Sequence, residues 1–259
     1  MFGAIIGDII GSTREFNNTK DYDFELFPKH SDFTDDTVLT CAVANAILTG
    51  SSYKDSIVEF AHRYPGRGYG GGFNRWLNSM DTDKPYNSYG NGSAMRVSPI
   101  GFAFSTLEKT LEEAKKSAEV SHNHPEGVKG AQAVASAIYL ARNKESQSYI
   151  KMYIIKHFGY NLERNLDDIR PNYKFYETCQ ESVPEAIIAF LESENYEDAI
   201  RKAISLGGDS DTIGCITGGI AQAYFDKIPS ELLKEGYKTL STELTNIVQQ
   251  FNKKFKIEE

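Results

Sequence analysis

Features typical of membrane, secreted and disulfide-rich proteins are scarce in this sequence. No uninterrupted apolar run reaches roughly eighteen residues, and the apolar start carries Asp8 with no basic segment ahead of it. The three cysteines, Cys41, Cys179 and Cys215, are an odd number and share no metal-ligand spacing. We therefore expect no membrane span, no secretion signal and no disulfide framework, and we predict a cytoplasmic protein with reduced thiols.

Excess positive charge is also missing, because the formal net charge is -8. This argues against broad nucleic-acid binding, which needs a positive surface to displace phosphate counterions. A small phosphorylated ligand stays possible, since backbone N–H groups or divalent cations can hold a diphosphate on an acidic protein. A chain of 259 residues that is 40% hydrophobic can supply a sizeable core. We expect one domain spanning residues 1–259, and a monomer.

The strict alternation of half-buried strands is rare, so the sequence predicts an all-α fold. Residues 36–48 and 128–142 are rich in alanine and aliphatic residues on several faces, which is typical of helices buried in a bundle. Residues 106–119 have a charged face and indicate a peripheral helix. Ser105 and Glu108 form the pattern of a capping box at its start.

The second half of the chain predicts further helices, and its middle contains a long loop-rich stretch. Pro184 fits the first turn of a helix, and residues 196–206 predict an amphipathic helix that stops at Gly207 and Gly208. Residues 230–256 predict one or two closing helices. The loop-rich stretch 64–99 is too long for a simple connection and indicates a functional surface.

Gly3, Gly7 and Gly11 are spaced four residues apart within an apolar segment. On a helix they share one face, although each costs about 1 kcal/mol relative to alanine in a helix interior. Close packing against another helix or close approach of a ligand would compensate, and the spacing alone leaves both open. The same spacing continues to Glu15, which places an acidic group where that helix ends.

Two acidic clusters precede apolar helices. The first is Thr34-Asp35-Asp36-Thr37, and the second contains Asp209, Asp211 and Thr212 after a pair of glycines. Each could be a simple helix cap. Two clusters of this kind, however, offer hard oxygen ligands that suit Mg²⁺, Mn²⁺ or Ca²⁺. We predict that the two helix starts approach each other and share a metal pair about 3.5 to 4 Å apart.

Two other segments indicate ligand binding. The turn 89–96 is rich in small residues that could present N–H groups to phosphate, and Arg96 could make a paired ionic contact, although an ordinary turn with a structural arginine is the alternative. His122 and His124 lack a third metal ligand at useful spacing. A role in positioning a phosphate or sugar hydroxyl fits them better.

In order along the chain, the segments GAIIGDIIGSTRE, TDDT, GNGSAMR, SHNHP and LGGDSDT resemble the motifs of the ADP-ribosylglycohydrolase family. The resemblance covers residues 3–219 and implies a compact orthogonal helical bundle with two Mg²⁺ or Mn²⁺ ions in a central cleft. It implies a metal shell of Thr34, Asp35, Asp36, Asp209, Asp211 and Thr212. Asn91, Gly92, Ser93, Met95 and Arg96 would cradle the diphosphate and nearby ribose, with His122 on the opposite wall.

The family's chemistry is hydrolysis of the bond between ADP-ribose and an acceptor. Glu15, Asp36 and Asp209 are the expected catalytic carboxylates, with the general base left open between Glu15 and Asp36. For Asp8 we expect a structural hydrogen-bonding role. No position of these motifs is missing, which favours an active enzyme.

ADP-ribosyl-arginine on protein is the first expected substrate, and the segment 67–85 is expected to select the leaving group. Alternatives within the same chemistry are an O-linked serine adduct, O-acetyl-ADP-ribose and a nucleic-acid adduct. Two alternatives of another class are a non-catalytic ADP-ribose-binding or crystallin-like protein and a helical module stabilised by Ca²⁺.

Overall fold

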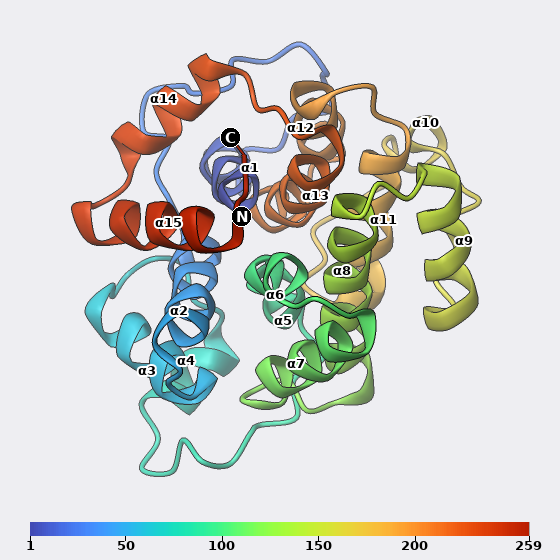
Figure 1. The fold of residues 1–259 in the computed structure, drawn as a ribbon. Coiled ribbons are helices and arrows are strands. Elements are labelled where there is room, and N and C mark those ends of the chain that lie inside the picture. The colour runs from blue at the N-terminus through green and yellow to red at the C-terminus, as the bar shows by residue number, and fades with distance from the viewer. Residues whose placement is uncertain (259) are drawn as a thin grey trace.

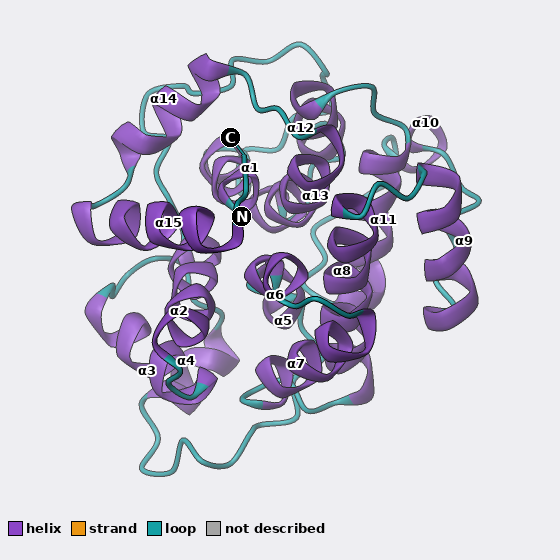
Figure 2. Ribbon diagram, in the orientation of Figure 1, coloured by secondary structure: helices purple, strands orange, loops and turns teal. Residues whose placement is uncertain are grey.

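The computed structural model describes residues 1–258, and this part of the chain consists of α-helices and loops without a β-strand (Figures 1 and 2). The all-α prediction is confirmed. The helices are α1 (Phe2–Ser12), α2 (Asp35–Thr49), α3 (Tyr53–Arg63), α4 (Gly71–Leu77), α5 (Gly92–Met95), α6 (Ser98–Ala103), α7 (Leu107–Glu119), α8 (Pro125–Arg142), α9 (Gln147–Phe158), α10 (Leu166–Ile169), α11 (Cys179–Leu191), α12 (Tyr196–Ile204), α13 (Ser210–Phe225), α14 (Ser230–Thr239) and α15 (Thr242–Phe255).

The centre of the fold is the pair α1 and α13, which lie side by side and make the most extensive contact between any two helices described (Figure 1). Every residue from Phe2 to Gly11 is buried. A Cβ atom on Gly3 would lie 2.5 Å from the carbonyl oxygen of Gly218, and one on Gly214 would lie 2.6 Å from that of Gly7. The glycine spacing of α1 therefore serves a close helix crossing, the first of the two predicted explanations.

The ends of α2 and α13 follow from local sequence. Thr34 caps α2 by accepting a hydrogen bond from the Asp36 N–H, and Gly50 ends the helix in a left-handed conformation. Before α13, Gly207 and Gly208 have φ values of 68° and 76°. Such values suit glycine, so this pair can turn the chain sharply into α13.

Helix existence was predicted better than helix boundaries. The first turn of α7 is capped by Thr106, whose side chain accepts from the Lys109 N–H, so the capping box expected at Ser105 was wrong by one residue. Pro184 lies inside α11 and not in its first turn, because this helix already begins at Cys179. The closing segment forms two helices, α14 and α15.

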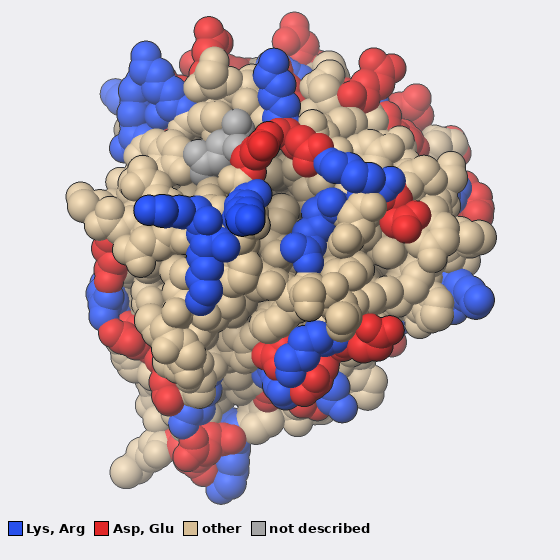
Figure 3. Space-filling view, in the orientation of Figure 1, with Lys and Arg blue, Asp and Glu red and all other residues tan. Residues whose placement is uncertain are grey.

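The stretch 64–99 contains α4, α5 and the start of α6, joined by loops. Between α4 and α5 the chain forms a long excursion at the edge of the molecule, drawn in teal in Figure 1. Met80 lies there and is fully exposed. On the face shown in Figure 3, acidic and basic side chains are interspersed among uncharged ones.

Candidate active site

One pocket gathers several helix starts and loops around a set of acidic side chains. Its wall includes Glu15 in the loop after α1, the starts of α2 and α13, the turn before α5 and the segment 68–73. Six carboxylates line it: Glu15, Asp35, Asp36, Glu177, Asp209 and Asp211. The two acidic clusters, which are separated by more than 170 positions in the sequence, therefore meet in space.

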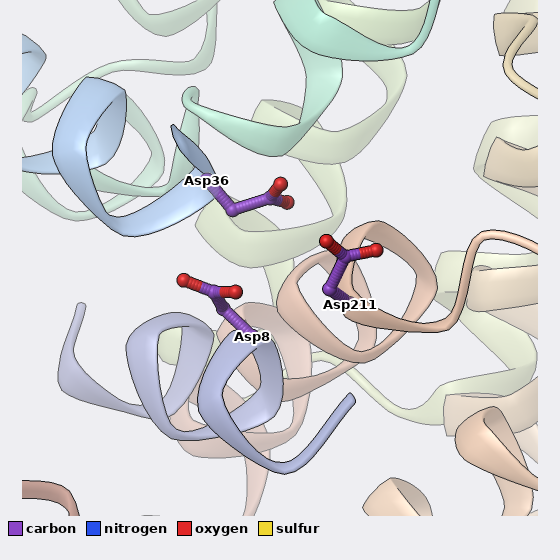
Figure 4. Close-up of side chains that lie close together, drawn as sticks. All are labelled: Asp8, Asp36 and Asp211. Atoms are coloured by element: carbon purple, nitrogen blue, oxygen red, sulfur yellow. The ribbon is translucent and has the colours of Figure 1, made fainter. Parts of the chain in front are cut away.

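Two groups of three carboxylates have the spacing of a metal site. Oxygen atoms of Asp8, Asp36 and Asp211 lie within 4.8 Å of one another, and so do those of Glu15, Asp209 and Asp211. Figure 4 shows the first group, in which the side chains come from α1, α2 and α13 and turn toward a common point. Asp211 belongs to both groups, so the two candidate ion positions are adjacent.

Asp8 is held by donors from the start of α2. Its carboxylate accepts hydrogen bonds from the Thr34 N–H at 3.0 Å and hydroxyl at 2.7 Å, and from the Thr37 N–H at 3.0 Å and hydroxyl. These bonds tie α1 to α2 beneath the pocket. They fit the structural role expected for Asp8, while its place in one carboxylate group was not anticipated.

Burial and mutual repulsion raise the pKa values of these carboxyl groups. For Glu15, burial is the main cause, and the charges of Asp211, Asp8 and Glu177 add to it, which brings its pKa to about 8. Burial also raises the pKa of Asp209 to about 6, although the hydrogen bond from Asn91 opposes this shift. The pKa values of Asp36 and Asp211 are raised well above the usual range by burial and by their acidic neighbours.

The residues present fit a divalent cation. The Asp36 side chain is 1% exposed, and its Oδ1 atom is buried without a hydrogen-bond partner among residues 1–258. Its Oδ2 atom accepts from the Thr212 hydroxyl at 3.3 Å, and the Thr34 hydroxyl, whose hydrogen goes to Asp8, lies at the same distance. A buried, partly unpartnered carboxylate among other carboxylates is costly unless a cation compensates it. Oxygen-only ligands suit a hard ion such as Mg²⁺ or Mn²⁺.

Some residues of the turn before α5 and of α5 itself line the pocket, and others do not. Asn91, Gly92, Met95 and Arg96 lie along its wall, but Ser93 does not. The Ser93 hydroxyl donates to the Gly127 carbonyl oxygen at 2.7 Å and is fully buried. Asn91 donates from Nδ2 to Asp209 Oδ2 at 2.7 Å, so its side chain orients a candidate metal ligand.

Arg96 and His122 are deeply placed. The Arg96 side chain has no exposed surface, and its Nη2 atom donates to the Ser117 carbonyl oxygen and to Ser121 Oγ. The guanidinium is thus covered in this geometry while Arg96 lines the pocket, and its expected contact with a phosphate stays a prediction. His122 is 4% exposed, and burial, reinforced by Arg96, holds its pKa well below the usual range.

Sequence reasoning missed two groups that line the pocket. Glu177 comes from the irregular segment before α11, where no pattern distinguishes it from other polar loop residues. Phe73 and Tyr86 lie within the stretch 64–99, which was predicted to be a functional surface without either residue being singled out. The aromatic character of this stretch was the available signal for them. His124, by contrast, caps α8 and lies outside the pocket wall.

The comparisons with known proteins agree with this geometry. The family model described as ADP-ribosylglycohydrolase matches residues 1–258. The chain belongs to the ADP-ribosylglycohydrolase family. Human ADP-ribosylhydrolase ARH3 is 28% identical, over 92% of this chain and 88% of its own length. ADP-ribosylarginine hydrolase Tri1 of Pseudomonas putida is 25% identical, over 87% of this chain and 69% of its own length.

A solved structure titled "ADP-ribosylglycohydrolase-related protein complex" has the same fold, with a TM-score of 0.75 at 21% identity. The match covers 97% of this chain and 94% of that one. The expected fold is thereby confirmed for this ADP-ribosylglycohydrolase. Family membership assigns it to the enzymes that hydrolyse ADP-ribose from an acceptor. Among the described residues, no helix is long and apolar enough to cross a membrane.

Proposed function

We propose that this glycohydrolase uses two divalent cations to cleave ADP-ribose from modified arginine side chains. The observation that carries the proposal is the position of Asp211, which has carboxylate oxygens within 4.8 Å of Asp36 in one acidic group and of Asp209 in the other. A shared carboxylate between adjacent ion positions is typical of two-metal hydrolytic sites.

The metal shell that we propose combines the two helix starts. It consists of Thr34, Asp35, Asp36, Asp209, Asp211 and Thr212, and the ions are Mg²⁺ or Mn²⁺. When bound, such ions supply positive charge that polarises the ribose hydroxyls and lowers the pKa of a nearby water. The unpartnered Oδ1 atom of Asp36 and the bond from Asn91 to Asp209 support this assignment.

Glu15 is the general base in our proposal, and Asp36 and Asp209 are metal ligands. Glu15 lines the pocket and is only partly buried, whereas Asp36 is 1% exposed and already accepts a hydrogen bond from the Thr212 hydroxyl. Glu15 would take a proton from the water that attacks the anomeric carbon. The carbon–nitrogen bond breaks with its electron pair on the acceptor, and Glu15 can return the proton there.

The turn before α5 is the proposed diphosphate site. Gly92 places backbone at the pocket wall beside Asn91, whose own N–H donates to the Glu177 carbonyl oxygen. Met95 lies beside Thr212, and His122 faces the turn from the opposite side. Ser93 contributes through its backbone position, since its hydroxyl is turned toward Gly127. Backbone N–H groups of small residues are well suited to phosphate oxygens.

Arginine as the acceptor is supported by the charge of the pocket. Glu15, Asp35 and Glu177 lie along its wall in addition to the innermost aspartates, which favours a cationic leaving group. The relative from Pseudomonas putida is itself described as an ADP-ribosylarginine hydrolase. The segment 67–85 borders the pocket through Gly68 and Phe73, and we propose that it selects the acceptor. We also propose that the chain acts as a single-domain monomer.

A substrate panel tests this proposal. Peptides ADP-ribosylated on arginine or serine, O-acetyl-ADP-ribose and an ADP-ribosylated oligonucleotide are incubated with Mg²⁺, Mn²⁺, Ca²⁺ or EDTA, and released ADP-ribose is measured by mass. We expect release from the arginine peptide with Mg²⁺ or Mn²⁺ and none with EDTA or in Asp209→Ala. If ADP-ribose were released faster from another substrate of the panel, arginine would be rejected as the acceptor. Full activity of Asp209→Ala would reject the two-metal site.

A further inference from the structure

Arg96 is a buried cation without a carboxylate partner. Its side chain is 0% exposed, and its hydrogen bonds run from Nη2 to the Ser117 carbonyl oxygen at 2.8 Å and to Ser121 Oγ at 3.0 Å. The Nε and Nη1 atoms are buried without a partner among residues 1–258. Burial lowers the pKa of Arg96 to about 10, so the group remains charged at neutral pH. A buried charge without a charged partner is costly to the fold.

The hydroxyl of Ser121 connects this charge to His122. Ser121 is fully buried, and its Oγ atom lies 2.8 Å from His122 Nδ1. A serine hydroxyl has one hydrogen to donate, and a guanidinium can only donate. Within residues 1–258, His122 Nδ1 is therefore the one acceptor within reach of the Ser121 hydrogen. If Nδ1 carried a hydrogen itself, the Ser121 hydrogen would be buried without an acceptor, which is unfavourable.

We propose that Arg96 is a positioning residue which, through Ser121, fixes His122 as the neutral tautomer with its hydrogen on Nε2. Arg96 occupies one acceptor site of the serine oxygen, and the hydroxyl hydrogen then points to Nδ1. The positive charge of Arg96 next to the ring opposes a second proton there. His122 thus becomes a hydrogen-bond donor with a single direction.

That direction leads to the turn before α5. A Cβ atom on Gly92 would lie 3.1 Å from His122 Nε2, and one on Gly90 would lie 3.7 Å from it. No hydrogen bond from residues 1–258 reaches this Nε2 atom, so its N–H is available to a ligand in the pocket. Resting on the proposed function, we assign this donor to an oxygen of the ADP-ribose diphosphate. Arg96 then acts on the diphosphate through Ser121 and His122 and not by direct contact.

The tautomer can be observed without any substrate. In ¹⁵N-labelled protein, a long-range ¹H–¹⁵N correlation spectrum of the histidine rings distinguishes a protonated nitrogen from a bare one, and the signals of His122 are assigned by their loss in His122→Gln. We expect a protonated Nε2 and a bare Nδ1 at neutral pH. In Ser121→Ala and Arg96→Met this preference should weaken. The buried-serine control Ser136→Ala, on α8, should keep it.

A protonated Nδ1 in the unaltered protein would overturn the proposal, and so would a ring spectrum that does not change in Ser121→Ala. Melting temperatures show which variants fold. If Arg96→Met does not fold, the spectrum of Ser121→Ala still tests the proposed tautomer of His122, because this variant keeps Arg96.

Binding of ADP-ribose provides the second readout. The amide nitrogen of glutamine reaches the position of Nε2, whereas that of asparagine reaches only the position of Nδ1. We expect His122→Asn to raise the Kd for ADP-ribose about tenfold, and His122→Gln to recover most of this loss. Ser121→Ala should raise KM with little change in kcat. Equal losses in the two His122 variants would contradict the assigned donor, whereas no binding by the unaltered protein would instead reject the proposed function.

Discussion

Gly214 on α13 lies against Gly7 on α1 so closely that a Cβ atom at position 214 would be 2.6 Å from the Gly7 carbonyl oxygen. This contact sets the separation of the two helices that carry Asp8 and Asp211. The spacing of these two carboxylates, which belong to one candidate metal group, thus depends on two residues without side chains.

Gly214→Ala should destabilise the protein by about 1–3 kcal/mol, because the methyl group can be accommodated only if the helices move apart. The same movement should weaken Mg²⁺ binding. Urea unfolding and titration with Mg²⁺ measure the two effects. Gly70→Ala is the control, since a Cβ atom at Gly70 has open space around it. Equal stability of the two variants would show that the α1–α13 contact can relax.

Without metal, the protein should lose stability as the pH rises from about 4 to about 8. The folded state raises the pKa of Asp8 and Asp209 to about 6 and that of Glu15 to about 8, so it binds more protons than the unfolded state in this window. The contribution of these three groups to folding stability is fully present below their pKa values in the unfolded state. It disappears above their pKa values in the folded state. We expect the melting temperature in EDTA to fall across this range. Mg²⁺ should increase the melting temperature more at pH 8 than at pH 5. An increase in melting temperature that does not depend on pH would argue against ion binding at these carboxylates.

Asp8→Asn should destabilise the fold by about 1–3 kcal/mol or more. The carboxylate accepts from two N–H groups and two hydroxyls at the start of α2, whereas an amide offers one acceptor oxygen and adds two donors. Chemical denaturation in EDTA isolates this effect from metal binding. Ser12→Ala, which removes a hydrogen bond within the same helix and one from the Asp32 N–H, is the matched control. If both variants have the same stability, Asp8 is not the link between α1 and α2.

Glu15→Gln separates the general base from the metal ligands. We expect kcat to fall by about 10²–10⁴ while Mg²⁺ still raises the melting temperature, because Glu15 contributes the proton acceptor. Asp211→Asn should lose activity and the Mg²⁺ effect together, since Asp211 belongs to both carboxylate groups. If Mg²⁺ no longer raised the melting temperature of Glu15→Gln, Glu15 would be a metal ligand and Asp36 would be the better candidate for the general base.

Asn91→Ala should weaken metal binding by about 10-fold to 100-fold, because Asp209 loses the hydrogen bond that orients it. Calorimetric titration with Mn²⁺ measures the affinity directly. Ser93→Ala, two residues away with its hydroxyl turned from the pocket, is the control and should bind Mn²⁺ normally. Normal affinity in Asn91→Ala would restrict Asn91 to substrate binding.

The acidic clusters and the glycine repeat were readable from the sequence because each is a local pattern with a physical cost. Adjacent carboxylates repel, and glycines weaken a helix, so both indicate a partner in space. Asp36 and Asp211 do meet, and Gly7 packs on α13. The helix starts of α2 and α13 followed from the same residues.

Other features depend on long-range packing and had no local signal. Asp8 joins the carboxylates because α1 and α2 cross, and Glu177 reaches the pocket from an irregular segment. For Arg96, a motif gives the residue type but not its burial, which results from the approach of α7 to the turn before α5. The cap of α7 differed from the prediction because Ser105 and Thr106 are both suitable capping residues and packing selects one.

An isolated antiparallel bridge joins Gly90 to Thr178 beside the pocket. The Asn91 N–H donates to the Glu177 carbonyl oxygen at 2.8 Å, and the Cys179 N–H donates to that of Tyr89 at 3.0 Å. These two backbone bonds join the segment that contains Glu177 to the turn before α5, so a displacement of Glu177 either carries this turn with it or breaks both bonds. If the turn before α5 holds the diphosphate as proposed, a movement of Glu177 that admits a bulky acceptor would also change how the diphosphate is held.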